Sequence, residues 1–220
     1  MRKISFYIIT FAVSLAVVIF LYNLILGQKN KNFPSEAKFS INQSSEELFI
    51  GKESAQVTII EYFSMTCHHC SKFHNEVLPK IEEEFVEKGL VKFVFRDFPL
   101  DPLALEAAKI PHCYKNDFRK VQNMLLHDQK KWIANALSMD EYVNIGMSNM
   151  KTLLVNNGLD YADIQSCIEN DELGDMILET RLDAQSKFKI NSTPTLVING
   201  EIYSGALPYS QIEKIIKENL

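Results

Sequence analysis

Apolar runs alternate with amphipathic stretches along this chain, and the pattern predicts a buried sheet covered by helices. Residues 57–63 (Val-Thr-Ile-Ile-Glu-Tyr-Phe) are too uniformly apolar for a one-sided strand, so they predict a central strand. Within residues 67–88, every fourth position from Phe73 to Phe85 is apolar, which predicts an amphipathic helix, kinked at Pro79. After Gly89, residues 90–96 predict a second strand. Strand, helix and strand together imply a parallel pair joined by a crossover.

The pattern of apolar and polar residues changes in the second half of the chain. Residues from about 101 to 188 are predominantly helical in pattern, which predicts an inserted helical subdomain. Strand character returns at 195–198, and an Asn-Gly pair joins it to a short strand at 201–204, a strong signal for a hairpin. Residues 209–219 predict a final amphipathic helix.

The N-terminus carries a long hydrophobic segment. Residues 4–26 contain no charge, and as a helix they would span about 34 Å, enough for a bilayer core of about 30 Å. No convincing cleavage site follows, so a retained anchor is favoured over a cleaved signal peptide. We therefore expect a signal anchor or transmembrane helix at 1–27, a polar tether at 28–47 and an exported domain at 48–220.

Composition narrows the classes of function. The 220 residues suffice for one domain with an appendage, and 46% hydrophobic against 23% charged residues is typical of a globular protein. The net charge of -5 provides no basic excess for binding phosphates. Nucleic acid is therefore not expected as a partner.

The candidate chemistry lies in Cys67-His68-His69-Cys70, where the buried strand gives way to a helix. At a helix N-terminus, unpaired N–H groups and the helix dipole stabilise a thiolate at Cys67. Cys70 would lie one turn further in and be more buried. We therefore expect Cys67 to be the exposed nucleophile and Cys70 its resolving partner, with the imidazoles of His68 and His69 favouring the thiolate.

A stabilised thiolate stabilises the reduced state of the pair. If the pKa of Cys67 fell from about 8.5 to about 4.5, the part below pH 7 would contribute about 3.4 kcal/mol, which makes the disulfide about 70 mV more oxidising. An inert structural disulfide is one alternative, although this spacing is typical of reactive pairs. A metal site is another, formed by Cys67, Cys70, His68 or His69, and His74, but no second set of paired ligands supports it.

The motif and its surroundings resemble the thioredoxin superfamily and, within it, the DsbA-like thiol oxidases. The resemblance runs from about Leu48 to the C-terminus. It implies a thioredoxin-like α/β fold with the helical insertion at about 101–188. The segments that carry it are Gly51–Ala55, Glu61–Ser64 before Cys67, Ser192–Gly200 and Ser204–Leu207.

The resemblance also implies roles for single residues. Pro194 matches the cis-proline that faces the redox pair, so Thr193 would offer backbone hydrogen bonds to an extended substrate. Glu61 matches a buried acid that assists proton transfer at the resolving thiol. The alternative for Glu61 is a carboxylate that escapes to a sheet edge. His69 matches the family, whereas His68 replaces the proline of its best-known members.

Two cysteines remain in the helical insertion. In an oxidising compartment, leftover cysteines are more often paired than free, so Cys113 and Cys167 are expected to form a structural disulfide. Trp132 is expected in the core of the insertion. The remaining histidines are expected to face solvent or to make ordinary hydrogen bonds: His74, His112 and His127.

The resemblance implies a protein disulfide oxidoreductase that introduces disulfide bonds into unfolded exported proteins through a mixed disulfide at Cys67. It would act as a monomer on the periplasmic side of the bacterial inner membrane, anchored or secreted, without metal or organic cofactor. A DsbB-type membrane protein would reoxidise it. A disulfide isomerase or reductase on the same fold is the nearest alternative, and a metal-binding assembly chaperone is a more distant one.

Overall fold

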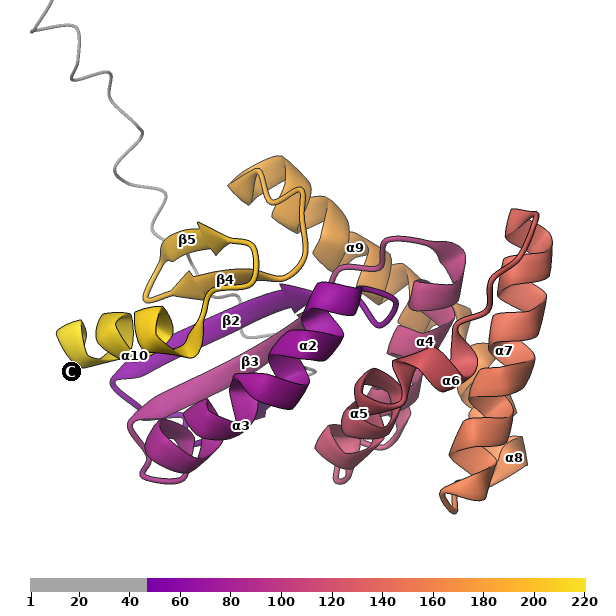
Figure 1. Cartoon of the computed structure of the whole chain (residues 1–220), viewed down its shortest axis with the longest axis horizontal. Coiled ribbons are helices and arrows are strands. Elements are labelled where there is room, and N and C mark those ends of the chain that lie inside the picture. Colours follow the sequence, from indigo (N-terminus) through magenta and orange to yellow (C-terminus); the bar gives the residue numbers. More distant parts are fainter. Residues whose placement is uncertain (1–46) are drawn as a thin grey trace, which may run out of the picture. The chain divides into compact units, whose positions relative to one another are not determined.

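The computed structural model describes residues 47–220, which contain one five-stranded sheet in the order β1-β3-β2-β4-β5 (Figure 1). The expected anchor and all of the expected tether except Glu47 lie outside the described residues. Within residues 47–220, no helix is both long enough and apolar enough to cross a membrane. The strands are β1 (Leu48–Ile50), β2 (Val57–Phe63), β3 (Val91–Asp97), β4 (Thr195–Ile198) and β5 (Glu201–Ser204).

Strand β2 occupies the centre of the sheet, as its uniformly apolar sequence predicts. It runs parallel to β3, with Val57 opposite Val91, and antiparallel to β4, with Ile59 opposite Ile198. Six of its seven residues are buried, because helices cover both faces of the sheet. Strand β1 pairs antiparallel with β3 and was not predicted, since three residues are too few to show a period of two.

Helices α2 (His68–Glu76), α3 (Leu78–Ile81) and α10 (Tyr209–Glu218) cover one face of the sheet, and α9 (Asp171–Phe188) crosses the other (Figure 1). The single kinked helix predicted for 67–88 is instead broken at Val77, two residues before Pro79. A proline ring displaces the preceding turn but fits the first turn of a new helix, so α3 restarts around it. A short π-helix, η1 (Glu82–Val86), completes the segment.

The helical insertion is confirmed, running from the start of α4 to the end of α9. Helix α4 packs against four of the other insertion helices, and Trp132 is fully buried in their core, as predicted, with its indole N–H donating to the carbonyl of Leu125 at 2.8 Å. The helices before α9 are α4 (Pro102–Cys113), α5 (Phe118–His127), α6 (Gln129–Trp132), α7 (Met139–Asn156) and α8 (Tyr161–Ile168).

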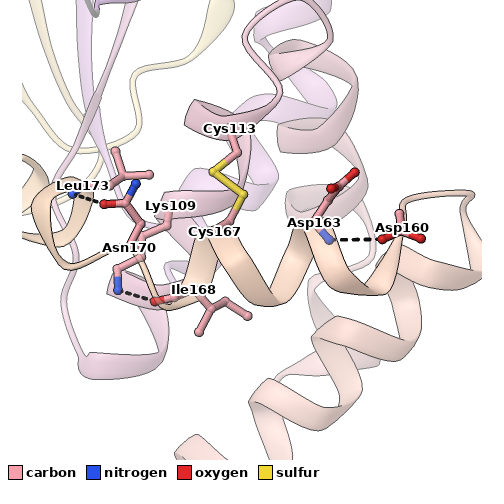
Figure 2. The surroundings of a disulfide bond; sticks show 8 residues. All are labelled: Lys109, Cys113, Asp160, Asp163, Cys167, Ile168, Asn170 and Leu173. Atoms are coloured by element: carbon pink, nitrogen blue, oxygen red, sulfur yellow. Dashed lines mark hydrogen bonds between the residues drawn. A yellow bond between two sulfur atoms is a disulfide. The ribbon is translucent and has the colours of Figure 1, made fainter.

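A disulfide joins two helices of the insertion. Cys113, the last residue of α4, bonds to Cys167 near the end of α8, with the Cα atoms 6.2 Å apart (Figure 2). This is the pairing expected from the sequence. Beside it, the ammonium of Lys109 donates to the carbonyl of Ile168 at 2.8 Å, which gives one of the last carbonyls of α8 a partner.

Candidate active site

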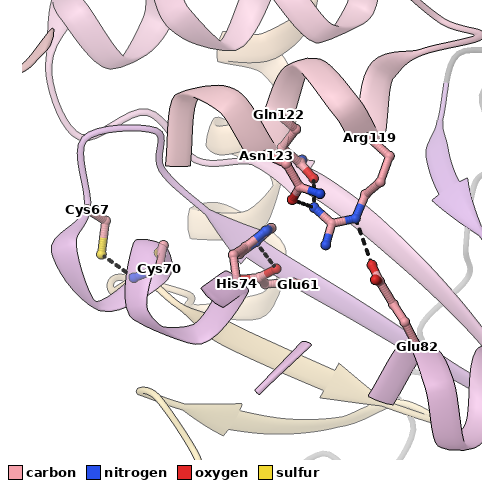
Figure 3. A network of polar contacts seen from close by, with 8 residues as sticks. All are labelled: Glu61, Cys67, Cys70, His74, Glu82, Arg119, Gln122 and Asn123. Atoms are coloured by element: carbon pink, nitrogen blue, oxygen red, sulfur yellow. Dashed lines mark hydrogen bonds and ion pairs between the residues drawn. The ribbon is translucent and has the colours of Figure 1, made fainter. Parts of the chain in front are cut away.

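The two cysteines of the motif lie at the start of α2, directly after the loop that follows β2. Cys67 is the N-cap residue, and its sulfur accepts a hydrogen bond from the backbone N–H of Cys70 at 3.3 Å (Figure 3). The first N–H groups of a helix have no acceptor within the helix, and the Cys67 side chain provides one of them with an acceptor. The sequence pattern placed both residues correctly.

Burial differs between the two thiols less than expected. Cys67 keeps only 8% of its surface exposed, and Cys70 is completely buried. The expectation of an exposed nucleophile is therefore corrected: Cys67 is itself a mostly buried residue. Only a small part of Cys67 is therefore open to solvent, and none of Cys70 is.

The pKa values of the two thiols are shifted in opposite directions. The pKa of Cys67 is lowered to about 6, first by the thiol of Cys70, which donates to the Cys67 sulfur, and more weakly by the side chain of Thr193 and nearby backbone N–H groups, against the opposing effect of burial. The pKa of Cys70 is raised well above its ordinary value by burial, by Cys67 and by the charge of Glu61. One sulfur is thus poised as a thiolate and the other as a thiol.

The histidines between the cysteines have a smaller part than expected. His68 and His69 are both exposed, with their rings 6.0 Å apart. His69 acts on Cys67 through its backbone N–H, and neither imidazole is among the main causes of the lowered pKa. The thiolate is stabilised chiefly by Cys70 and by the backbone at the helix start, rather than by the two rings.

The loop before β4 faces the redox pair. The peptide bond between Thr193 and Pro194 is cis, and the thiol of Cys67 donates to the carbonyl of Thr193 at 3.5 Å. The sequence therefore identified two segments, 126 residues apart, that meet in space.

Glu61 is fully buried beneath the pair. It lies on β2, between Phe95 of β3 and Leu196 of β4, so the alternative of a carboxylate at a sheet edge is wrong. Its Oε2 atom is 2.8 Å from Nε2 of His74, which is also buried (Figure 3). Sequence reasoning missed this pairing, although a histidine one turn after Cys70 on the same helix was a usable signal.

Two further contacts that sequence reasoning missed hold the loop before α2. The buried amide of Gln129 donates to the carbonyls of Met65 and Cys67, at 2.8 and 3.1 Å. The hydroxyl of Thr66 donates to the carboxylate of Asp101 at 2.6 Å. Both partners come from the insertion, which therefore helps to position the nucleophile.

The metal-site alternative needs at least three ligands close together. Within the part of the chain that the structure describes, no group of three His, Cys, Asp or Glu side chains is arranged to hold a metal ion. His74, the third ligand considered from the sequence, is paired with Glu61 instead.

Comparison with known proteins agrees with this geometry. A family model described as thioredoxin matches residues 43–218. Disulfide bond formation protein D of Bacillus subtilis is 27% identical over 180 residues, which cover 78% of this chain and 76% of that protein. A candidate protein-disulfide oxidoreductase of Rickettsia conorii is 24% identical over 177 residues, 79% of this chain. The chain spans only 61% of that relative's length.

A solved structure shows the same fold. Alpha-DsbA1 of Wolbachia pipientis superposes with a TM-score of 0.70 at 25% identity, covering 80% of this chain and 91% of that one. The family match, these relatives and the structural likeness agree with the arrangement of sheet, insertion and cysteine pair. The chain belongs to the thioredoxin superfamily, as a DsbA-like member.

Proposed function

We propose that this protein is a thiol-disulfide oxidoreductase that works in the oxidising direction, transferring its Cys67–Cys70 disulfide to substrate thiols. The observation that carries the proposal is the opposite proton affinity of two sulfurs at one helix start, with the pKa of Cys67 at about 6 and that of Cys70 well above its ordinary value. A substrate thiolate attacks the Cys67 sulfur, and Cys70 leaves. A second substrate thiolate then releases Cys67 as a stable thiolate.

The lowered pKa sets the direction of exchange. Compared with an ordinary thiol of pKa about 8.5, a Cys67 thiol of pKa about 6 favours the reduced pair at neutral pH by about 1.4 kcal/mol, or about 30 mV. This is less than the 70 mV that follows from an assumed pKa of about 4.5, but the sign is the same. The effect makes the oxidised pair a better donor of disulfides.

Substrate contact would fall to the loop of Thr193 and Pro194, which lies against the Cys67 sulfur. An extended chain that pairs with the backbone there would bring its own sulfur next to Cys67, so unfolded exported proteins with reduced cysteines are the substrates we propose. Glu61 would exchange a proton with Cys70 as that thiol attacks or leaves.

Residues 1–27 would anchor the domain, through the tether at 28–47, on the periplasmic side of the inner membrane, and a DsbB-type membrane protein would reoxidise the pair. The relatives named as disulfide bond formation protein D and as alpha-DsbA1 support an oxidative role in a bacterium. We propose that a single copy suffices, because both sulfurs and the loop that faces them belong to one chain.

The first test is the equilibrium potential of the Cys67–Cys70 pair in the full chain against glutathione, with the Cys113–Cys167 pair monitored separately by mass spectrometry. We expect a potential above that of the glutathione pool, about -220 to -260 mV, and rapid disulfide transfer to a reduced, unfolded protein. A Cys67→Ser variant is the control and should transfer nothing.

The same measurement tests the nearest alternative. A potential near about -270 mV, typical of a cytosolic reductant, would overturn the oxidase proposal and favour a reductase on the same fold. Efficient rearrangement of the wrong disulfides in a scrambled protein, together with slow disulfide transfer to a fully reduced protein, would favour a disulfide isomerase.

A further inference from the structure

The buried pair formed by Glu61 and His74 has a histidine that the disulfide exchange described above does not use. Nε2 of His74 is 2.8 Å from Oε2 of Glu61, and their side chains are 1% and 0% exposed. The imidazole lies among aromatic rings, with its centroid 5.4 Å from that of Phe63 and 5.9 Å from that of Phe95. An isolated charge would be costly in such surroundings, whereas a hydrogen-bonded pair can hold one proton between its members.

Each member of this pair has a second polar atom without a partner. Oε1 of Glu61 and Nδ1 of His74 are buried and make no hydrogen bond to any residue that the structure describes. A buried polar atom without a partner is destabilising, so a purely structural pair would be expected to satisfy both atoms. The similar pair of His112 and Asp97, 2.7 Å apart, has no atom that is both buried and unpartnered.

The two unpartnered atoms belong to residues that connect the redox pair to the protein surface. The charge of Glu61 acts on Cys70 at one end. At the other end, His74 lines a cleft of about 820 Å³ between α2 and α5, and Figure 3 shows it between the cysteine pair and Arg119. The charged or titratable groups that share this cleft with His74 are Glu82, Arg119, Lys120, His127 and Asp128.

We propose that His74 is a positioning residue for the exchange reaction, which orients the Glu61 carboxylate and passes the Cys70 proton between Glu61 and the water of the α2–α5 cleft. The proposal rests on the function proposed above and adds the path of the proton. The loop of Thr193 and the docked substrate cover the sulfur of Cys67, so this path leaves on the other side of α2.

The bonds and the proton can be followed through the attack on Cys67 and through its reverse. When a substrate thiolate attacks, the bond between the substrate and Cys67 sulfurs forms and the Cys67–Cys70 bond breaks. The Cys70 sulfur takes the electron pair and a proton from Glu61, which regains a proton through His74 from water. Cys70 is then a thiol, while Cys67 stays oxidised in the mixed disulfide until a second substrate thiolate attacks the substrate sulfur and releases Cys67, which completes the two-electron reduction of the pair. In the reverse step Cys70 attacks Cys67, and its proton leaves by the same route.

A dipyridyl disulfide separates the two thiols in one experiment on the reduced full chain. Attack by Cys67 releases one pyridinethione in a bimolecular phase. Attack by Cys70 on the resulting mixed disulfide then releases a second in a unimolecular phase, which requires Cys70 to lose its proton. Stopped-flow absorbance across a range of pH therefore reports the proton path in the second phase alone.

Two variants of His74 distinguish proton transfer through the imidazole from a purely structural role beside Glu61. His74→Gln keeps a hydrogen-bond donor for Glu61 but cannot carry a proton, and His74→Phe fills the space among the neighbouring rings. We expect both to slow the second phase by about tenfold or more at neutral pH and to make it rise in proportion to hydroxide, while the first phase is unchanged. His112→Gln, in the buried pair with Asp97 whose buried polar atoms are all partnered, should change neither phase.

The outcomes separate the proposals. If His74→Gln has the second-phase rate and pH profile of the unmodified protein, the hydrogen bond alone matters and the proton path is overturned. Equal losses in His74→Gln and His112→Gln would overturn it as well. If the unmodified protein releases no second pyridinethione, the two cysteines do not act as an exchanging pair, and the proposed function fails together with the relay.

Discussion

At the scale of single residues, Cys70 stabilises the Cys67 thiolate more than any other group does. Its thiol donates to the Cys67 sulfur and is the largest cause of the lowered pKa. Cys70→Ala removes this donor but keeps the backbone N–H that caps the helix, so we expect the Cys67 pKa to rise above about 6 without a return to its ordinary value. Thiolate absorbance, or the rate of alkylation, measured against pH gives the midpoint.

The same pKa predicts a pH dependence of stability. Because the pKa of Cys67 is lower in the folded protein than in the unfolded chain, the stabilisation of the reduced form is complete above the unfolded value of about 8.5 and is lost as the pH falls through about 6. The oxidised form lacks this contribution and serves as the control. For the Cys67 thiolate titration described above, an unchanged pKa in Cys70→Ala would show that the backbone alone stabilises the thiolate.

The sequence could identify those residues whose signal is local. Cys67 and Cys70 stand three positions apart at a strand end, and the family pattern implied Glu61. His74 was not recognised as the partner of Glu61, because a lone histidine on an amphipathic helix is usually ordinary and the two residues come from different elements. Which residues pair depends on how α2 is rotated against β2, and no local pattern states that rotation.

At the scale of elements, Asp101 links helix α4 to the active-site loop. Its Oδ1 atom accepts from the backbone N–H of Ala104 at 2.8 Å and caps α4, while Oδ2 accepts from the hydroxyl of Thr66, the residue before Cys67. Asp101→Ala removes both bonds, so we expect the free energy of unfolding to fall by about 1 kcal/mol or somewhat more. Urea denaturation followed by circular dichroism measures the loss.

Asp101→Asn is the matched control for this prediction. Its amide oxygen can still cap α4, but its NH₂ group cannot accept from Thr66. We expect it to keep most of the stability and to lose only the restraint on the loop. Equal destabilisation by Ala and Asn would place the main contribution in the Thr66 contact and contradict the assignment of the cap.

Elements were predictable in proportion to their length and their periodicity. Strand β2 and the hairpin of β4 and β5 carry patterns that few other structures satisfy. The break at Val77, the π-helix after it and the three-residue β1 depend on packing against the rest of the sheet, which a window of sequence does not contain.

At the scale of the molecule, the Cys113–Cys167 disulfide joins helices α4 and α8 through two cysteines that are 54 residues apart in sequence. A cross-link over a loop of this length restricts the unfolded chain, and such links typically contribute about 2–4 kcal/mol. We expect the double variant Cys113→Ala/Cys167→Ala to be less stable by about that amount, measured by urea denaturation.

Loss of the disulfide should lower the stability of the domain but leave the geometry of the active site unchanged. Gln129 and Asp101 hold the Cys67 loop from helix α6 and from the start of α4, and neither hydrogen bond involves Cys113 or Cys167. The folded double variant should therefore keep a Cys67 pKa of about 6 and react with a dipyridyl disulfide in the same two phases. A shifted pKa in the folded double variant would mean instead that the disulfide also sets the position of the insertion against the thioredoxin domain, and that its reduction would change the reactivity of the redox pair.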